Sequence, residues 1–330
     1  SAGELVRGDQ DSHGRILAAA GGPGHGAAAY GGQVPSPTAA IRPMRPDDVA
    51  EAEQVSSESF HALDRLTLPR AWPEPEPRQG GRSRSWQART QHLLRTDPGG
   101  CWVAEEDGTM VGVVTSLVRE GTWILSTYAV RPGHQGRGVG KPLLAAALHH
   151  GRGALRGMLS SSADPRAVRV YRQAGLSLHP QMVLRGTLDR TAIPLGTGDK
   201  VREGSAGDQD LLDSVDRQAR GSAHGPDHPL LMAQSRLLVS ESTTGSGYAY
   251  ANPDGRVTLL AATNRRTAGR LLWSALADGA EQTEIAHVTA ANEWALDIGL
   301  AARLEVWTVG YLALRAMRPP SPYLHHGSLL

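Results

Sequence analysis

The segment from Val130 to Lys141 is the part of the chain whose residue types and spacing most clearly predict chemistry. It reads VRPGHQGRGVGK, with glycine at the alternate positions 136, 138 and 140, and it lies between an apolar run and a second apolar run of helical character. Glycine lets backbone amides approach a ligand closely, and amides at a helix N-terminus favour an anion. Because Arg137 and Lys141 add full positive charges, the segment predicts a site for a pyrophosphate group.

Two common phosphate-binding motifs do not fit this loop. A P-loop ending at Gly140-Lys141 needs glycine at position 135 and serine or threonine at 142, where the chain has Gln135 and Pro142. A dinucleotide fingerprint starting at Gly136 needs glycine or alanine where Lys141 stands, and it needs parallel strands, whereas the strands expected before the loop are linked by a hairpin. A glycine-rich turn without a ligand stays open as the alternative.

The residues around the loop resemble the GNAT N-acetyltransferase family. The order Gln135-x-x-Gly138-x-Gly140 after Tyr128-Ala129-Val130 is similar to the coenzyme A loop of that family. The resemblance extends over about residues 40–188, and it includes Ile41-Arg42-Pro43 leading into Asp47-Asp48 and the Tyr171-x-x-x-Gly175 end of a later helix.

The resemblance implies a mixed sheet splayed open between its fourth and fifth strands. The pantetheine arm of acetyl-CoA would lie in the gap, the pyrophosphate would rest on the amides of Gly136–Lys141, and the thioester would face Tyr171. Asp164 departs from the family, which often has asparagine seven residues before the tyrosine. The implied coenzyme A-binding residues are Tyr128, Ala129, Val130, Gln135, Gly136, Arg137, Gly138, Val139, Gly140, Lys141, Asp164, Arg166 and Ala167.

Composition and the resemblance together predict an α+β protein with two tandem GNAT-like domains, each a mixed, mostly antiparallel sheet flanked by helices. Residues 1–38 are rich in glycine and alanine without hydrophobic periodicity, which predicts a disordered tail. A catalytic domain is expected at 39–190, a degenerate GNAT-like domain at 198–318 and an extended tail at 319–330. The loop expected in the second domain, Thr263 to Arg270, lacks the alternating glycines, so that domain is predicted to bind no coenzyme A.

Hydrophobic periodicity and turn residues place the elements of both domains. Helices are expected at 46–60, 85–96, 140–150, 165–173, 208–219, 266–278 and 291–302. Strands are expected at 40–44, 101–105, 110–118, 123–130, 156–161, 182–188, 236–241, 248–251, 257–262, 283–288 and 304–313.

Acetyl transfer to an amine needs a neutral nucleophile, stabilisation of the oxyanion and a proton for the leaving thiolate. The resemblance implies that Tyr171 donates this proton, and the alternative is a Tyr171 that only packs in the core. Several family members have a glutamate base on the fourth strand, where this chain has Ile124.

Some multi-domain GNAT enzymes that modify aminoglycosides use their C-terminal carboxylate as the base, and this resemblance would give that role to Leu330. Burial would have to raise the pKa of such a carboxyl from about 3.5. A tail that merely covers a hydrophobic edge, and attack by an amine that is already deprotonated or that loses its proton through water, are the alternatives.

A metal site is not expected. His224 and His228 have a spacing seen in metal sites, but Gly225-Pro226 between them breaks any helix and no cysteine lies near. The pair His149-His150 falls at a helix C-terminus, where cationic side chains are favoured without a ligand role.

The charge balance and the cysteine count exclude several classes of protein. The net charge is +1, with 34 basic and 33 acidic residues, so nothing indicates a general affinity for nucleic acid or membranes. No run approaches the roughly 18 apolar residues of a membrane span. The single cysteine, Cys101, excludes an intrachain disulfide, and residues 1–38 lack the pattern of a secretory signal, so a cytoplasmic protein is expected.

The sequence therefore favours an acetyl-CoA-dependent N-acetyltransferase, a monomer or homodimer, acting by direct transfer in a ternary complex. The expected acceptor is the primary amine of a small molecule such as an aminoglycoside-like polyamine. A peptide or protein amine acetyltransferase and a non-catalytic acyl-CoA-binding protein stay open. An open groove would favour a peptide, and a pocket closed by the second domain would favour a small molecule. Mycothiol synthases are also tandem GNAT proteins, but their working loop lies in the C-terminal copy, unlike the loop here.

Overall fold

The first half of the fold is a sheet with helices on both faces. The computed structural model describes residues 39–330, so the predicted tail at 1–38 lies outside the described residues. The strands of this half are β1 (Ala40–Pro43), β2 (Cys101–Glu106), β3 (Thr109–Arg119), β4 (Thr122–Val130), β5 (Arg156–Ser161) and β6 (Ser177–Thr187). Its helices are α1 (Val49–Thr67), α2 (Gly81–Thr96), α3 (Gly140–His150) and α4 (Pro165–Gln173).

Two successive residues of β4 show which helices cover each face of this sheet. Ile124 lies in one core cluster with Val55 of α1 and Trp86 of α2. The next residue, Leu125, lies in another cluster with Leu143 of α3. Since successive side chains of a strand point to opposite faces, α1 and α2 cover one face and α3 covers the other. Tyr171 places α4 on the α3 face, because it belongs to the same cluster as Leu125.

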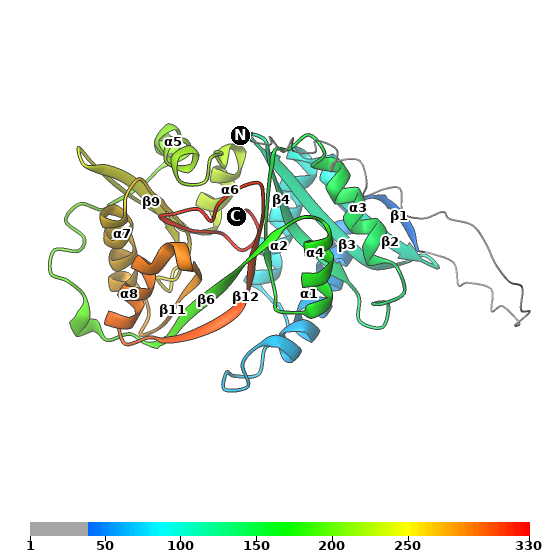
Figure 1. The fold of residues 1–330 in the computed structure, drawn as a ribbon, viewed down its shortest axis with the longest axis horizontal. Helices are drawn as coiled ribbons and strands as arrows, with labels where there is room; N and C mark the ends of the chain where they lie inside the picture. Colours follow the sequence, from blue (N-terminus) through cyan, green and yellow to red (C-terminus); the bar gives the residue numbers. More distant parts are fainter. Residues whose placement is uncertain (1–38) are drawn as a thin grey trace, which may run out of the picture. The chain divides into compact units, whose positions relative to one another are not determined.

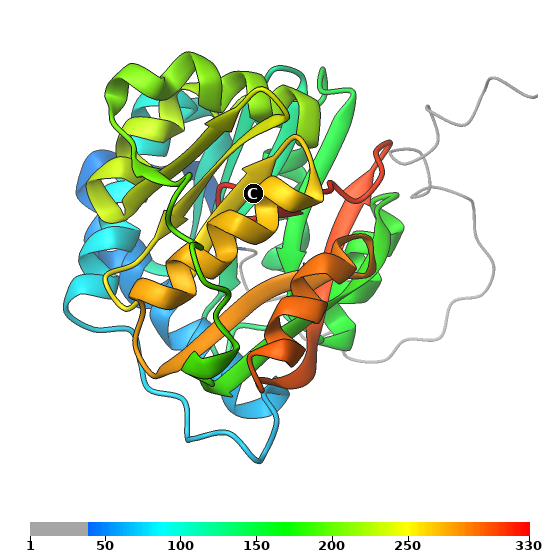
Figure 2. The ribbon, with the colours of Figure 1, turned by 90° about the vertical axis from the view of Figure 1, so that its left-hand side faces the viewer.

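The second half repeats this order of elements around a smaller sheet. Its strands are β7 (Arg202–Glu203), β8 (Arg236–Ser242), β9 (Gly245–Ala251), β10 (Val257–Ala262), β11 (Gln282–Thr289), β12 (Glu305–Arg315) and β13 (Tyr323–Leu324). Its helices are α5 (Gln209–Ala219), α6 (His228–Gln234), α7 (Arg265–Asp278) and α8 (Glu293–Ala301). One sheet of this half has the order β13-β10-β9-β8-β7, and its side chains form a core cluster with those of α7 and α8. Figure 2 shows these two helices in gold and orange.

The two halves share the larger sheet, whose order is β1-β2-β3-β4-β5-β12-β6-β11. Strand β12 of the second half lies between β5 and β6 of the first, antiparallel to both, and Figure 1 shows β6 and β12 running side by side. Strand β11 continues the sheet beyond β6. The α+β fold is confirmed, but the two predicted domains are joined by backbone hydrogen bonds, and their boundaries stay a prediction.

Most predicted elements are present, and the differences have local causes. Strand β6 begins at Ser177 rather than 182, because its first residues pair with β12. The predicted break at Gly225-Pro226 is a short 3-10 turn, and α6, which was missed, begins directly after it at His228. Within residues 39–330, no helix is both long enough and apolar enough to cross a membrane.

Candidate active site

The gap between β4 and β5 is the structural centre of the candidate site. The two strands pair in parallel from Thr122 with Arg156 to Leu125 with Leu159, and their pairing ends there. The rest of β4 stays paired with β3 as far as Val130. The backbone groups of residues 126–130 that face β5 therefore lie along an open edge, as the resemblance implied. Buried backbone groups need partners, so this edge fits an extended amide-containing chain.

The loop that follows β4 has the geometry of an anion cradle. Gly133, Gly136 and Gly138 have φ values of 87°, 78° and 90°, and a Cβ at any of them would meet nothing within 4 Å. Gln135 Nε2 donates to the main-chain oxygen of Val130 at 2.9 Å, which holds the loop against the end of β4. Because α3 begins at Gly140, the loop amides lie at a helix N-terminus and can bind a phosphate group.

A cavity of about 1250 Å³ joins this loop to the gap and to both halves of the fold. Typical small-molecule sites measure about 300–1,000 Å³, so there is room for a long co-substrate and a second ligand. The predicted residues that line it are Tyr128, Ala129, Val130, Gln135, Gly136, Gly138, Gly140, Lys141, Asp164, Arg166, Ala167 and Tyr171. Arg137 is exposed outside the lining, and Val139 is buried in the core beneath the loop.

Helix α4 positions Asp164 and Tyr171 at the cavity. Asp164 caps the helix by accepting the main-chain N–H of Arg166 at 2.9 Å, and Pro165 occupies the first helical position. The guanidinium of Arg166 also lies 2.8 Å from the Asp164 carboxylate, and this hydrogen bond lowers the pKa of Asp164.

Tyr171 is 6% exposed, and burial, together with Tyr128 and Asp164, raises the pKa of its hydroxyl above the ordinary value. Burial also raises the pKa of Tyr128 to about 12. A phenol with a raised pKa keeps its proton at neutral pH, so Tyr171 lies in the cavity as a protonated group.

Two arginines and a tryptophan line the cavity from the face that α1 and α2 cover, and none of the three was predicted from the sequence. Arg78 Nη2 donates to Ser56 Oγ at 3.0 Å, and its guanidinium carbon lies 5.3 Å from the ring centroid of Trp86. Arg78 Nη1 is buried without a hydrogen bond to any described residue. Arg89 lies on α2, and burial, with the charge of Arg78, lowers its pKa to about 10. Arg78 precedes α2 and Arg89 lies on it. Because this helix is rich in arginine, sequence alone does not indicate which arginines face the cavity.

The C-terminal segment contributes His326, Gly327 and Ser328 to the same cavity. His326 Nδ1 accepts the main-chain N–H groups of Ser328 at 3.1 Å and Leu329 at 3.0 Å. The neutral ring therefore carries its proton on Nε2. Burial, with the charge of Arg89, lowers the pKa of His326 to about 3, so the ring is neutral near pH 7.

Leu330 lies outside the cavity lining. Its side chain is fully buried, it does not line the cavity, and its terminal main-chain oxygen accepts a hydrogen bond from the guanidinium of Arg220. The predicted tail thus reaches the cavity through His326 rather than through Leu330, and a role for the Leu330 carboxylate as base stays a prediction.

Comparison with known proteins agrees with this geometry. A model described as the Acetyltransferase (GNAT) family matches residues 58–176, which include the loop and Tyr171. Residues 58–176 belong to the GNAT family. A curated mycothiol acetyltransferase from Streptomyces avermitilis is 39% identical over 88 residues, which are 25% of this chain and 29% of that protein. The chain thus matches less than a third of the length of this relative.

Solved structures resemble the whole described fold. A putative acetyltransferase from Pyrococcus horikoshii has a TM-score of 0.68 at 18% identity and covers 93% of this chain and 98% of its own. A tandem GNAT protein from the clavulanic acid biosynthesis pathway has a TM-score of 0.54 at 14% identity and covers 85% of this chain and 99% of its own. At these identities the likeness shows the fold, and it extends from the GNAT domain into the second half.

The second half has a different local structure where its own loop was expected. Asn264 caps α7 by accepting the main-chain N–H of Thr267 at 2.9 Å, and its amide group donates to the oxygen of Thr244. None of residues 263–270 lines the cavity of the GNAT domain. That the second half binds no coenzyme A stays a prediction.

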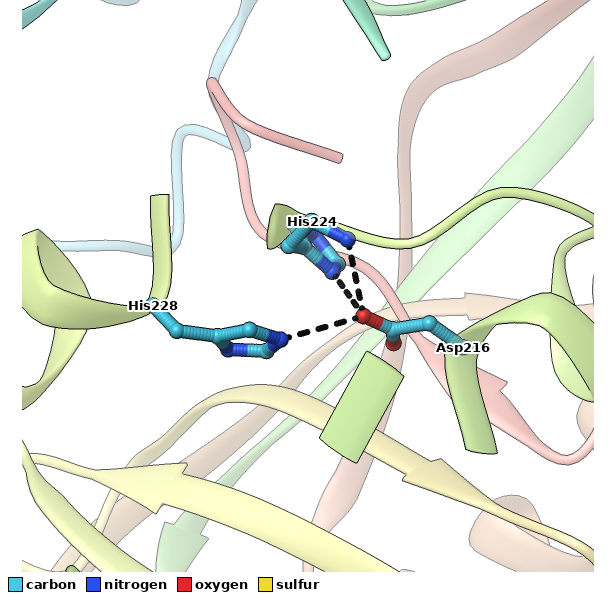
Figure 3. A group of neighbouring side chains, drawn as sticks. All are labelled: Asp216, His224 and His228. Atoms are coloured by element: carbon cyan, nitrogen blue, oxygen red, sulfur yellow. Dashed lines mark hydrogen bonds and ion pairs between the residues drawn. The ribbon is translucent and has the colours of Figure 1, made fainter. Parts of the chain in front are cut away.

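A buried cluster in the second half brings together Asp216, His224 and His228 (Figure 3). Asp216 Oδ2 accepts the main-chain N–H of His224 at 3.0 Å and its Nδ1–H at 2.7 Å, and it lies 3.4 Å from His228 Nε2. The hydroxyl of Tyr248 donates to Asp216 Oδ1. Burial opposes ionisation of Asp216, but the charge and the hydrogen bond of His224, together with the nearby His228, hold its pKa well below the ordinary value. These three residue types also suit a metal ion, so the expectation of no metal stays a prediction.

Proposed function

We propose that this protein is an acetyl-CoA-dependent N-acetyltransferase that acts on the primary amine of a small molecule by direct transfer in a ternary complex. The observation that carries the proposal is that the glycine loop, the open edge of β4 and Tyr171 line one cavity. The family of residues 58–176 supports the same activity.

The residues of the GNAT domain fit coenzyme A. Main-chain amides from Gly136 to Lys141 would hold the pyrophosphate, and the space above Gly136 and Gly138 is open to receive it. The open edge of residues 126–130 would hold the pantetheine arm by backbone hydrogen bonds. Acetyl-CoA supplies the activated acyl group as co-substrate. In this proposal Arg137 and Val139 contribute main-chain amides only, since their side chains do not line the cavity.

Tyr171 would deliver the proton that the departing thiolate needs, because its hydroxyl stays protonated at neutral pH. The amine must arrive neutral. Ile124 stands where several family members have a glutamate base, and it is fully buried in the core. Among the described residues that line the cavity, the only carboxylate is that of Asp164, which is paired with Arg166. The amine therefore loses its proton before binding or through water, unless the Leu330 carboxylate moves into the cavity.

Residues of the second half line the same cavity as those of the GNAT domain, which supports a small acceptor rather than a peptide. Gln234, Asn252, Thr258 and His326 line it together with the residues of α1 and α2. An aminoglycoside-like polyamine was the acceptor expected from the sequence, and it would meet Arg78 and Arg89 here. The buried free thiol of Cys101 is consistent with the proposed cytoplasmic location.

Titration with coenzyme A followed by an acceptor panel tests the proposal. Calorimetry should give one site per chain, and acetyl-CoA with the correct amine should release free thiol. Binding without thiol release for any amine would favour the alternative, a non-catalytic acyl-CoA-binding protein.

A further inference from the structure

We propose that the acceptor carries a carboxylate at the end of the molecule remote from its reacting amine, and that Arg89, Arg78 and the Nε2–H of His326 bind this carboxylate. The inference rests on the proposed function and names the acceptor class for the same cavity. It replaces the polycationic acceptor with an amino acid-like one.

The three groups converge from separate segments of the chain. Arg78 precedes α2, Arg89 lies on α2, and His326 belongs to the C-terminal segment, and all three line the cavity. Their shared position on the wall of one cavity is what allows them to act on one ligand group. The electrostatics agree, since the charge of Arg78 helps to lower the pKa of Arg89 and the charge of Arg89 helps to lower that of His326.

Some donors of this group have no partner elsewhere in the described chain. Between residues 39 and 330, no hydrogen bond or ion pair engages the guanidinium of Arg89, and Arg78 Nη1 is buried without an acceptor. Arg78 Nε lies 3.7 Å from Glu53, so only part of its charge is compensated. A buried donor without an acceptor is costly, and an oxygen of a bound carboxylate would supply one for Arg78 Nη1.

His326 acts as a donor in this arrangement and not as a base. Its Nδ1 is held by the N–H groups of Ser328 and Leu329, which fixes the proton of the neutral ring on Nε2. A cationic acceptor would find no lone pair on this side of the ring, whereas a carboxylate oxygen would find an N–H.

The phosphates of coenzyme A do not need these arginines. The loop amides, Lys141 and Arg166 belong to α3, α4 and the segment before them, on the opposite face of the sheet from α1 and α2. Arg78 and Arg89 lie on the α1 and α2 face, and residues of the second half line the same cavity. An acceptor reaching through the gap would present its amine to the thioester and its far end to the arginines.

Three amines of matched length test the inference: δ-aminovalerate, its carboxamide and cadaverine, which differ in one terminal group. With acetyl-CoA and the full chain, kcat/KM for the carboxylate should exceed that for the carboxamide roughly tenfold or more, and cadaverine should be the poorest. Arg89→Gln should remove most of this preference, and Arg89→Lys should keep part of it. The Kd for coenzyme A should change less than about twofold in either variant.

Arg95→Gln is the matched control, because Arg95 is exposed on the last turn of the same helix and does not line the cavity. It should keep the preference of the wild-type protein. Equal use of acid and amide, a preference for cadaverine, or an unchanged preference in Arg89→Gln would overturn the inference.

A binding measurement separates this inference from the proposed function. The coenzyme A-loaded protein should bind N-acetyl-δ-aminovalerate more tightly than its carboxamide, and Arg89→Gln should abolish the difference. If the acid binds more tightly than the carboxamide but no amine is acetylated, the result supports the carboxylate site and contradicts the proposed acetyl transfer. If coenzyme A binds and the acid and amide bind equally, the carboxylate site is wrong whatever the transfer assay shows.

Discussion

The hydroxyl of Tyr128 occupies the space in which residue 140 would carry a Cβ. Gly140 begins α3, and its missing side chain lets Tyr128 lie against the first turn of the helix, between the open edge of β4 and the anion cradle. Gly140→Ala should push the Tyr128 ring toward the gap and weaken coenzyme A binding by about tenfold, because the ring would enter the space of the pantetheine arm. Calorimetry measures this, and an unchanged Kd would mean that the arm does not run past Tyr128.

Gly138→Asp should abolish coenzyme A binding. The φ of Gly138 is 90°, so a side chain there strains the loop, and its carboxylate would point into the cradle. Gly153→Asp is the control, since a Cβ at Gly153 also meets open space but lies outside the cavity lining. Calorimetry should give one site per chain for the wild-type protein and the control, and none for Gly138→Asp. A second site per chain would refute the prediction that residues 263–270 bind no coenzyme A.

Tyr171→Phe should lower kcat by about 10²–10⁴-fold and leave the coenzyme A Kd unchanged, because a proton donor acts in the transition state. Single-turnover kinetics would isolate the chemical step. Tyr311→Phe is the matched control, since Tyr311 lies on β12 outside the cavity lining. An unchanged single-turnover rate for Tyr171→Phe would leave Tyr171 as a packing residue.

Leu329→Ala should destabilise the protein by about 2–5 kcal/mol, because Leu329 is 1% exposed within the core cluster shared by both halves. Leu195→Ala, at a fully exposed leucine, should change stability by less than about 0.5 kcal/mol. Urea unfolding measures both. Equal effects of the two substitutions would show that the C-terminal segment is not packed in solution.

Stability should fall as the pH is lowered from 7.5 to 5. Burial lowers the pKa of His224 to about 4, that of His287 to about 4 and that of His326 to about 3. Below the ordinary value of about 6.5 the unfolded chain takes up protons that the folded chain does not, so each histidine costs at most about 1.4 kcal/mol per pH unit. The loss is complete only when the pH reaches the folded pKa values.

Melting temperatures at pH 7.5, 6 and 5 check this dependence. The carboxylates with lowered pKa values, Asp97, Asp216 and Asp227, add their own loss only below about pH 4, near the ordinary pKa of aspartate. His287→Asn should flatten the slope between pH 6.5 and 5, since an amide can still donate to Gln181 as His287 Nδ1 does. A flat profile in the wild-type protein would contradict the burial of these rings.

Local patterns were enough to predict the loop, its helix and the position of Tyr171. Each of these features has a signal in neighbouring residues. The loop has an apolar strand before it and glycines at positions with positive φ, and the helix that carries Tyr171 begins with Asp164-Pro165. The shared sheet was not predictable in this way. The pairing of β6 with β12 joins residues more than a hundred positions apart, and no local signal specifies such a register.

The places of Arg78, Arg89 and His326 in the cavity could not be predicted for the same physical reason. Arg78 and Arg89 face the cavity only because α2 packs on the core through Trp86, and His326 reaches it only because Leu329 and Leu330 are buried behind it. The sequence-based prediction placed Leu330 at the site, whereas the structure brings His326, Gly327 and Ser328 of the same segment to the cavity.

Transfer of the acetyl group itself is the most direct test of the account. The wild-type chain, acetyl-CoA and an amine would be followed at once by free thiol release and by mass spectrometry of the amine. The account predicts one acetylated amine for each thiol released, with both signals lost in Gly138→Asp. Thiol release that is equal without the amine, or a full yield of acetylated amine from Gly138→Asp, would contradict it.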